Sequence, residues 1–388
     1  MEEVYPPYLR DDSHWARVTI VMQVTERLPR MAQPKILVTA ATGNTGFPAA
    51  MQLLKRQYPV RAFVRKENER SKALRAMGAE IFVGSLDDIG DVRRALVGVQ
   101  RAYFCPPILP GLLDKSVIFA TAAQEANLEF VVVMTQWTAE PIHHSIHTRQ
   151  HWLGDNVFRQ MRDVQSAFVN PGWFADNYLG APELITQFGI LPMPLGNGFN
   201  APPSNEDIAR VVVGILDNPA PHVGQTYRPT GPKLLSPQEI AGALSAATGR
   251  KVRYINVPLS MFGKIGRSLG LPDYTTGQVL HYLADYQLNA FGKGAPTNVV
   301  EEIGGSPAED FETIARRYLA PTMKRTIGTR VGTSRRMMMG MMKGITNLKV
   351  ISKVDDYKLT NVTYSADSKA WLETHDSLRS EEQSPTPR

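Results

Sequence analysis

Residues 39–46 read Thr-Ala-Ala-Thr-Gly-Asn-Thr-Gly and form the first pattern that could do chemistry. Ala40, Gly43 and Gly46 are spaced three apart, a Gly-x-x-Gly-x-x-Gly frame with alanine in its first position. Glycine serves where backbone must turn or approach a phosphate closely. A helix that starts near Gly46 would point its free N–H groups at the same phosphates. The alternative is an ordinary turn. The spacing predicts a dinucleotide site made by Thr39, Ala40, Thr42, Gly43, Asn44, Thr45 and Gly46.

Basic residues end the second predicted strand, Val60–Arg65, and no acid follows before Glu67. NAD-binding proteins place Asp or Glu at this point to hold the ribose 2′-hydroxyl. Arg65 offers instead a planar, permanently charged group that matches a 2′-phosphate. The alternative is a solvated surface arginine. We therefore predict that Arg65 contacts the cofactor and that NADP(H) is preferred over NAD(H).

Two further residues lie where the third and fourth predicted strands end. Asp87 could accept a hydrogen bond from an adenine amino group, or it could cap the helix that begins at Asp88. Cys105 precedes Pro106-Pro107 and is expected near the cofactor as a small buried residue rather than as a nucleophile. Both residues are predicted to line the cofactor site.

The alternation of strands and helices from residue 35 onward would bring these residues together. The expected strands are short and apolar: Lys35–Thr39, Val60–Arg65, Glu80–Val83, Arg101–Cys105, Phe130–Thr135 and Gln165–Asn170. Apolar strands separated by helices argue for a parallel sheet buried on both faces. The predicted fold class is α/β, a Rossmann-type parallel sheet with a smaller C-terminal substrate lobe and a basic, partly disordered tail.

Three regions follow from this pattern. Residues 1–33 are an N-terminal extension. Residues 34–320 form the NAD(P)-binding domain, with 34–170 as the Rossmann core and 171–320 mostly as the substrate lobe. Residues 321–388 are a basic, methionine-rich tail whose end, rich in Ser, Glu and Pro, is expected to be disordered.

Charge is unevenly distributed along the chain. Lys324–Lys353 holds eight basic residues and no acid. The whole chain has a formal net charge of +6, so the rest of the chain carries a net charge of −2. The basic character therefore indicates no specific nucleic-acid binding by the main domain. The tail also contains five methionines within 337–342. It could lie on an anionic membrane surface, dock on a protein partner or pack on the chain's own body.

The composition also bears on the compartment. The single cysteine allows no intramolecular disulfide, and no run of 18 apolar residues predicts a transmembrane helix. The N-terminus carries acids and no apolar signal region. A cytoplasmic location is therefore expected.

Taken together, these motifs resemble the NmrA-like group of atypical short-chain dehydrogenase/reductases over roughly residues 34–320. The resemblance rests on Thr42–Gly46, Val60–Arg65, the Gly84/Asp87 turn, Pro171–Asn177, Asn205–Ala209 and Thr230–Ser236. It implies the Rossmann fold and NAD(P) binding. The family includes NADPH-dependent quinone and dye reductases, and also regulators that bind the cofactor without turnover.

The proton-donating residues of the relatives are missing here. Short-chain dehydrogenases use Tyr-x-x-x-Lys, and none of the 13 tyrosines has lysine four residues on. Reductases of the isoflavone-reductase kind keep a lysine at the start of the helix after the fifth strand, but this chain has no lysine between Lys115 and Lys233. Thr135 replaces the usual serine at the end of the fifth strand and is expected at the cofactor.

His151 and Arg149 are the catalytic candidates, because they open the helix on which the relatives keep lysine. A neutral imidazole could polarise a carbonyl as hydride arrives, and the helix dipole disfavours its cationic form. Arg149 could do the same with permanent charge. The alternative is that both are solvated or line a pocket without chemistry.

Spacing of four also relates His143, His147, His151 and Asp155, which on one continuous helix could ligate a metal. Pro141 and Thr148 suggest that the helix starts late and leaves the first histidines in a loop, so no metal is predicted.

The predicted function is an NADPH-dependent reductase of a carbonyl, quinone-like or conjugated small molecule. The alternative is a non-catalytic NADP(H)-sensing regulator that acts through a protein partner.

Overall fold

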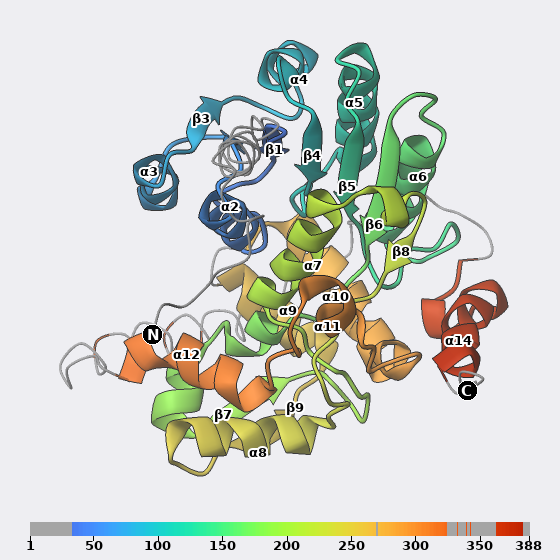
Figure 1. Ribbon diagram of the computed structural model, residues 1–388. Helices are drawn as coiled ribbons and strands as arrows, with labels where there is room; N and C mark the ends of the chain where they lie inside the picture. Colours follow the sequence, from blue (N-terminus) through green and yellow to red (C-terminus); the bar gives the residue numbers. More distant parts are fainter. Residues whose placement is uncertain are drawn as a thin grey trace, which may run out of the picture. The chain divides into compact units, whose positions relative to one another are not determined.

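The computed structural model describes residues 33–268, 271–323 and 362–382, with isolated positions 332, 339 and 342 (Figure 1). The N-terminal extension before residue 33 lies outside the described residues. So does nearly all of the basic segment 324–353, and with it the predicted membrane or partner contact.

A seven-stranded sheet with the order β3-β2-β1-β4-β5-β6-β8 forms the centre, and every neighbouring pair is parallel. Its strands are β1 (Ile36–Val38), β2 (Val60–Val64), β3 (Glu80–Val83), β4 (Arg101–Phe104), β5 (Phe130–Met134), β6 (Gln165–Val169) and β8 (Thr226–Tyr227). The strand order reverses between β1 and β4, as in a Rossmann fold. The predicted α/β fold class is confirmed.

Both faces of this sheet are buried, because alternate side chains of each strand enter different cores. Ile36 and Val38 belong to one apolar cluster, and Leu37 between them belongs to another. The first cluster draws residues from α2 (Gly46–Lys55) and α7 (Asn205–Asp217). The second draws residues from helices α4 (Ile89–Leu96), α5 (Leu112–Glu125) and α6 (Ile146–Arg159). The continuous apolar runs in the sequence reflect this two-sided burial.

A third core builds the smaller lobe. It packs the two-stranded parallel sheet of β7 (Ile190–Met193) and β9 (Arg253–Asn256) with helices from the C-terminal half. These helices are α8 (Pro237–Thr248), α9 (Leu259–Ser268), α10 (Asp273–Gln287) and α12 (Phe311–Met323). Two further helices of the described chain are α3 (Glu69–Ala76) and α11 (Val299–Gly304). Sequence patterns missed β7, α10, α11 and α12.

Residues after 170 are shared between the two lobes. Helix α7 packs on the main sheet and β8 pairs with β6, so both belong to the Rossmann half rather than to the smaller lobe. Beyond the basic segment the chain returns to the body. Helix α14 (Lys369–Glu382, red in Figure 1) extends past residue 377, where disorder was expected, and its Trp371 is only 3% exposed.

Candidate functional site

The glycine-containing loop lies between β1 and α2, beside the switch point of the sheet. Ala40 has a φ of 45°, the left-handed conformation usually left to glycine. The carbonyl of Ala40 accepts a hydrogen bond from the Gly43 N–H at 2.7 Å. A Cβ atom at Gly46 would lie 2.3 Å from that carbonyl oxygen, and one at Gly43 would lie 3.0 Å from it. Both glycines therefore allow α2 to approach the end of β1, as a phosphate-binding loop requires.

Threonine side chains fasten this loop to β4. The Thr39 hydroxyl donates to the Tyr103 carbonyl at 3.1 Å and accepts from the Cys105 N–H at 2.7 Å. The Thr45 hydroxyl lies 3.3 Å from the Cys105 sulfur. Burial raises the pKa of the Cys105 thiol, so the thiol stays protonated at neutral pH. These hydrogen bonds hold the loop against the end of β4.

Asn44, at the tip of the loop, is held by the smaller lobe. Its side-chain amide donates to Asp176 at 2.8 Å, and Asn205 donates to the same carboxyl oxygen at 2.9 Å. Arg70 donates to the Thr42 carbonyl at 3.0 Å from the other side. Burial raises the pKa of Asp176. Sequence reasoning did not single out Asp176 or Arg70 as site residues, although Asp176 stands inside the 171–177 motif.

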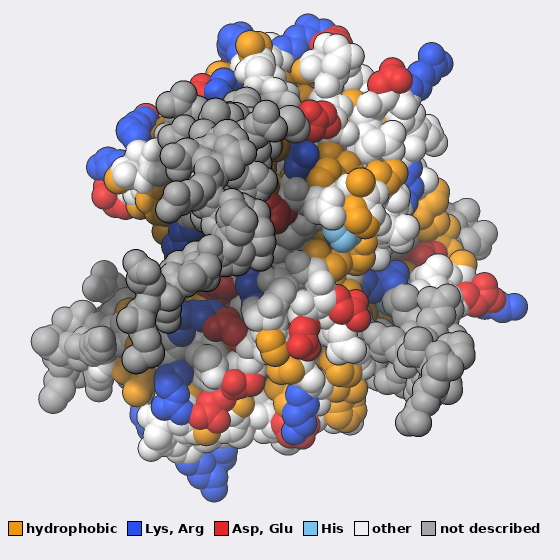
Figure 2. All heavy atoms as spheres, viewed as in Figure 1, with side chains coloured by type: hydrophobic (Ala, Val, Ile, Leu, Met, Phe, Trp, Pro, Cys, Tyr) orange, Lys and Arg blue, Asp and Glu red, His pale blue; other side chains and the backbone are white. Residues whose placement is uncertain are grey.

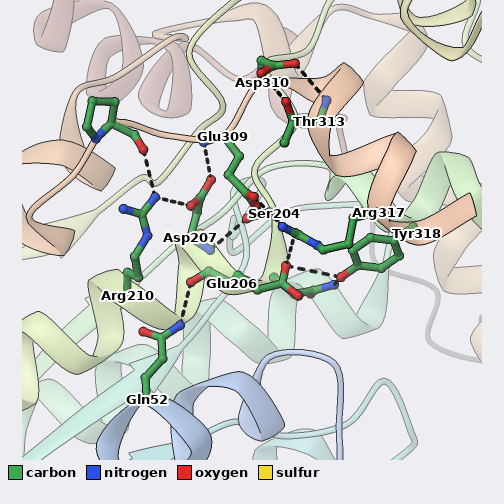
Figure 3. Close-up of polar contacts among 12 residues, drawn as sticks. Gln52, Ser204, Glu206, Asp207, Arg210, Glu309, Asp310, Thr313, Arg317 and Tyr318 are labelled. Atoms are coloured by element: carbon green, nitrogen blue, oxygen red, sulfur yellow. Dashed lines mark hydrogen bonds and ion pairs between the residues drawn. The ribbon is translucent and has the colours of Figure 1, made fainter. Parts of the chain in front are cut away.

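These contacts continue into a polar network at the start of α7 (Figure 3). Gln52 on α2 donates to the Glu206 carbonyl at 3.1 Å, and Arg317 on α12 pairs with the Glu206 carboxylate at 2.7 Å. Tyr318 accepts a hydrogen bond from Asn205 at 3.1 Å. The network joins the helix that follows the glycine loop to the smaller lobe.

Arg65 and Asp87 lie at the other end, where β2 and β3 finish. Arg65 directly follows β2, is exposed, and has no hydrogen-bond or ion-pair partner in the described part of the chain. Asp87 pairs with the buried Lys115 at 2.6 Å. The helix α4 is capped by Asp88, whose side chain accepts from the Asp91 N–H. Asp87 is thus free of capping, but Lys115 already holds one of its oxygens.

Thr135, directly after β5, contacts helix α6. Its hydroxyl donates to Asp155 at 2.6 Å, and burial raises the pKa of that carboxyl from 3.8 to about 7. His151 precedes Asp155 by four residues on the same face of α6, about 6 Å along the helix. Because Asp155 reaches the end of β5, His151 lies beyond the carboxyl edge of the sheet. Substrates and cofactors of open α/β sheets bind beyond this edge.

The two histidines on this face of α6 are buried and neutral. The His147 and His151 rings meet edge to face at 4.8 Å. Burial lowers the pKa of His147 to about 4, and burial together with His147 lowers that of His151 well below its usual range. The depression comes from desolvation, which is a different cause from the dipole considered in the sequence. A neutral imidazole can donate one N–H to an oxygen but carries no charge at pH 7.

Arg149 points away from this face. Arg149 is 7% exposed, and its guanidinium donates to the backbone carbonyls of His143 and His144. The His143 ring is bound to Asp285 at 2.8 Å, far along α10. Helix α6 begins at Ile146, earlier than expected, because Ser145 caps it through the Thr148 N–H. His143 therefore lies outside the helix, and the described residues contain no group of three or more metal-ligating side chains.

Three of the buried side-chain atoms that lack a hydrogen-bond partner in the described part of the chain belong to residues that follow β5 or β6. Gln136 Oε1, Asn170 Oδ1 and Trp173 Nε1 are buried, and each lacks a partner within the residues that the structure describes. Buried polar atoms are normally paired. Sequence reasoning did not identify them, apart from the motif that contains Trp173. These atoms, like the close-packed glycine loop, belong to segments that follow strands at the carboxyl edge of the sheet.

Outside this site, the visible face carries Lys, Arg, Asp and Glu side chains that are interspersed rather than grouped by sign (Figure 2). No helix among the described residues is long and apolar enough to cross a membrane.

Comparison with known proteins agrees with this arrangement. The chain is 31% identical over 293 residues to an NAD(P)H azoreductase of Xenophilus azovorans, which covers 74% of this chain and 98% of the azoreductase. The solved NADPH complex of the quinone oxidoreductase QOR2 from Escherichia coli matches with a TM-score of 0.62 and 21% identity, covering 73% and 99% of the two chains. NmrA, a negative transcriptional regulator solved in complex with NAD, matches with a TM-score of 0.63 and 17% identity, covering 76% and 98%.

A family model, the NmrA-like family, matches residues 32–311. The resemblance suggested by the sequence motifs is thereby confirmed: the chain belongs to the NmrA-like family.

Proposed function

We propose that this protein is an NADPH-dependent reductase of quinone-like, azo or other conjugated small molecules. The observation that carries the proposal is the placement of His151. The contact between Thr135 and Asp155 sets this histidine just beyond the carboxyl edge of β5, on the same edge as the glycine loop after β1. The names of the relatives, an azoreductase and a quinone oxidoreductase, support the substrate class.

Residues of this chain would hold the cofactor along that edge. The loop 39–46 would receive the pyrophosphate, Arg65 the 2′-phosphate and Asp87 the adenine, while Cys105 and Thr135 would line the nicotinamide end. When bound, NADPH supplies a hydride. Gln136 Oε1, Asn170 Oδ1 and Trp173 Nε1, which have no partner among the described residues, would orient the carboxamide or the acceptor.

His151 is the residue proposed to assist the reduction. Its neutral imidazole can donate an N–H to the oxygen or nitrogen on which negative charge develops. Arg149 was the other candidate, but its guanidinium is bound to the carbonyls of His143 and His144. Arg149 therefore supports the loop before α6 in this proposal, and His151 acts alone.

The smaller lobe is proposed as the substrate lobe. Its core includes Trp173 and Ala175 of the 171–177 motif, which directly follows β6. A cytoplasmic location is also proposed, on the single cysteine and the family fold.

A second candidate function is a cofactor-binding regulator without turnover. The missing Tyr-x-x-x-Lys and lysine favour it, and a transcriptional regulator is among the structural neighbours.

Arg65→Asp should reverse or abolish a preference for NADPH. The exposed guanidinium has no competing partner among the described residues, so a 2′-phosphate can bind it with charge-assisted hydrogen bonds. Such contacts contribute about 1.5–3 kcal/mol, or at least about tenfold in affinity. Calorimetric Kd values for NADPH and NADH measure the effect. Equal affinities of the unmodified protein for both cofactors would contradict the NADP(H) assignment.

The activity itself is tested by NADPH consumption with a panel of quinones, azo dyes and enones. Steady turnover with one class supports the reductase. NADPH binding with no turnover of any class would favour the regulator, and a partner that distinguishes oxidised from reduced complexes should then be sought.

A further inference from the structure

Residues 362–375 fold back onto the loop between β5 and α6, although they lie beyond the residues that the family model matches. The Thr363 N–H donates to the Ile142 carbonyl at 3.0 Å, and the Thr363 carbonyl accepts from the His144 N–H at 3.2 Å. Thr363 and His143 thus form an isolated parallel β-bridge. The returning segment adds backbone to a loop that starts right after Thr135 and ends where α6 begins.

A buried polar cluster fixes this pairing. The Ser365 N–H donates to one oxygen of Asp285 at 3.1 Å, and the His143 ring binds the other oxygen at 2.8 Å. His143 Nδ1 accepts from the Ser145 N–H, so Nε2 carries the proton and donates to Asp285. The side chains of His143 and Asp285 and the residue Ser365 are completely buried. The Ser365 hydroxyl also donates to the Thr138 carbonyl at 3.0 Å.

A buried aromatic side chain, Trp371, lies further along the returning segment. Trp371 donates its indole N–H to the Trp137 carbonyl at 3.1 Å and stacks on His375 at 3.8 Å between ring centroids. Ser368 donates to the Glu140 carboxyl group at 2.9 Å. Three separate carbonyl groups of the loop, at positions 137, 138 and 142, therefore accept from the returning segment. A surface tail would leave these groups to water.

We propose that residues 362–375 are a positioning strap for the substrate side of the site. The strap holds the loop 136–145 from outside, and the loop sets Gln136 and the first turn of α6 relative to the end of β5. The proposal rests on the proposed function, because it assigns Gln136 and His151 to the reaction. No strap residue contacts the glycine loop in the contacts described, so the phosphate end of the proposed cofactor site does not depend on the strap, and cofactor affinity should change little.

The test uses full-length variants. Ser365→Ala removes the hydroxyl that donates to Thr138, and Trp371→Phe removes the N–H that donates to Trp137 but keeps a packed ring. Lys369→Ala is the matched control on the same segment, since its side chain is 92% exposed. Each variant is compared by quinone kcat and KM, by the NADPH Kd and by hydrogen exchange of residues 136–145.

Both strap variants should lower quinone kcat/KM by about tenfold, as expected for loss of one buried hydrogen bond. Exchange of loop 136–145 should become faster, while the NADPH Kd stays within about twofold of the unmodified protein. Lys369→Ala should change none of these. Unaltered exchange of the loop in both strap variants would overturn the proposal. If the unmodified protein reduces no quinone, the proposed function fails, and hydrogen exchange still decides whether the strap holds the loop.

Discussion

Gly43→Val should abolish NADPH binding while the chain remains folded. The valine side chain would occupy the space between the loop backbone and the pyrophosphate, and its Cβ would begin 3.0 Å from the Ala40 carbonyl oxygen. Calorimetry should show no binding at NADPH concentrations that saturate the unmodified protein. Circular dichroism and thermal unfolding should show a folded protein.

Two other glycines calibrate this result. At Gly46 an added Cβ would lie 2.3 Å from the same carbonyl oxygen, so Gly46→Ala should disturb the start of α2 and lower stability as well as affinity. At Gly242, inside α8, an added Cβ meets nothing within 4 Å, so Gly242→Ala should leave NADPH affinity unchanged and should not lower stability. Normal NADPH affinity in a folded Gly43→Val variant would mean that the phosphates bind elsewhere.

His151→Ala should lower kcat by about 10²–10⁴-fold, the range expected when a group that assists proton movement is lost. NADPH affinity should be unchanged, because His151 lies on α6 and the cofactor is held mainly by the loop 39–46 and the ends of β2 and β3. His222→Ala is a suitable control, since the His222 ring binds the Tyr227 hydroxyl at 2.6 Å and makes no described contact with α6. Full kcat in His151→Ala would show that solvent or the substrate supplies the proton.

The pH dependence separates His151 from its neighbour Asp155. His151 stays neutral between pH 6 and 8, because its pKa lies well below the usual range. The Asp155 carboxyl, with a pKa of about 7, loses its proton in this window as pH rises. A rate change near pH 7 should therefore disappear in Asp155→Asn. If it disappeared only in His151→Ala, the neutral state assigned to His151 would be wrong.

The fold could be predicted from the sequence because its signals are local. Short apolar runs between helices mark strands that are buried on both faces, and the glycine spacing marks the loop after β1. The alternation of strands and helices also predicted that Thr135 lies at the end of β5. The predicted strand ends agree with the structure within about two residues, a normal uncertainty for assigned boundaries.

Contacts between distant residues could not be predicted in this way. Asn44 donates a hydrogen bond to Asp176, which lies 132 positions away in the sequence. Lys115 forms an ion pair with Asp87, but no sequence motif around Lys115 indicates this pairing. Arg149 looked catalytic by position, yet its guanidinium turns to the carbonyls before α6. The strap could not be predicted either. Ser365 and Trp371 are buried, but they lie in a polar segment whose sequence has no periodicity that indicates burial.

The most direct test of the reductase proposal is hydride transfer from NADPH to a quinone by the unmodified protein. Turnover should be measured with NADPH and with NADPH deuterated at the transferred position of the nicotinamide, at a saturating quinone concentration and in a single-turnover format. The account predicts NADPH-dependent quinone reduction whose chemical step is slower with the deuterated cofactor. Tight NADPH binding with no oxidation of the cofactor by any quinone or azo dye would contradict it.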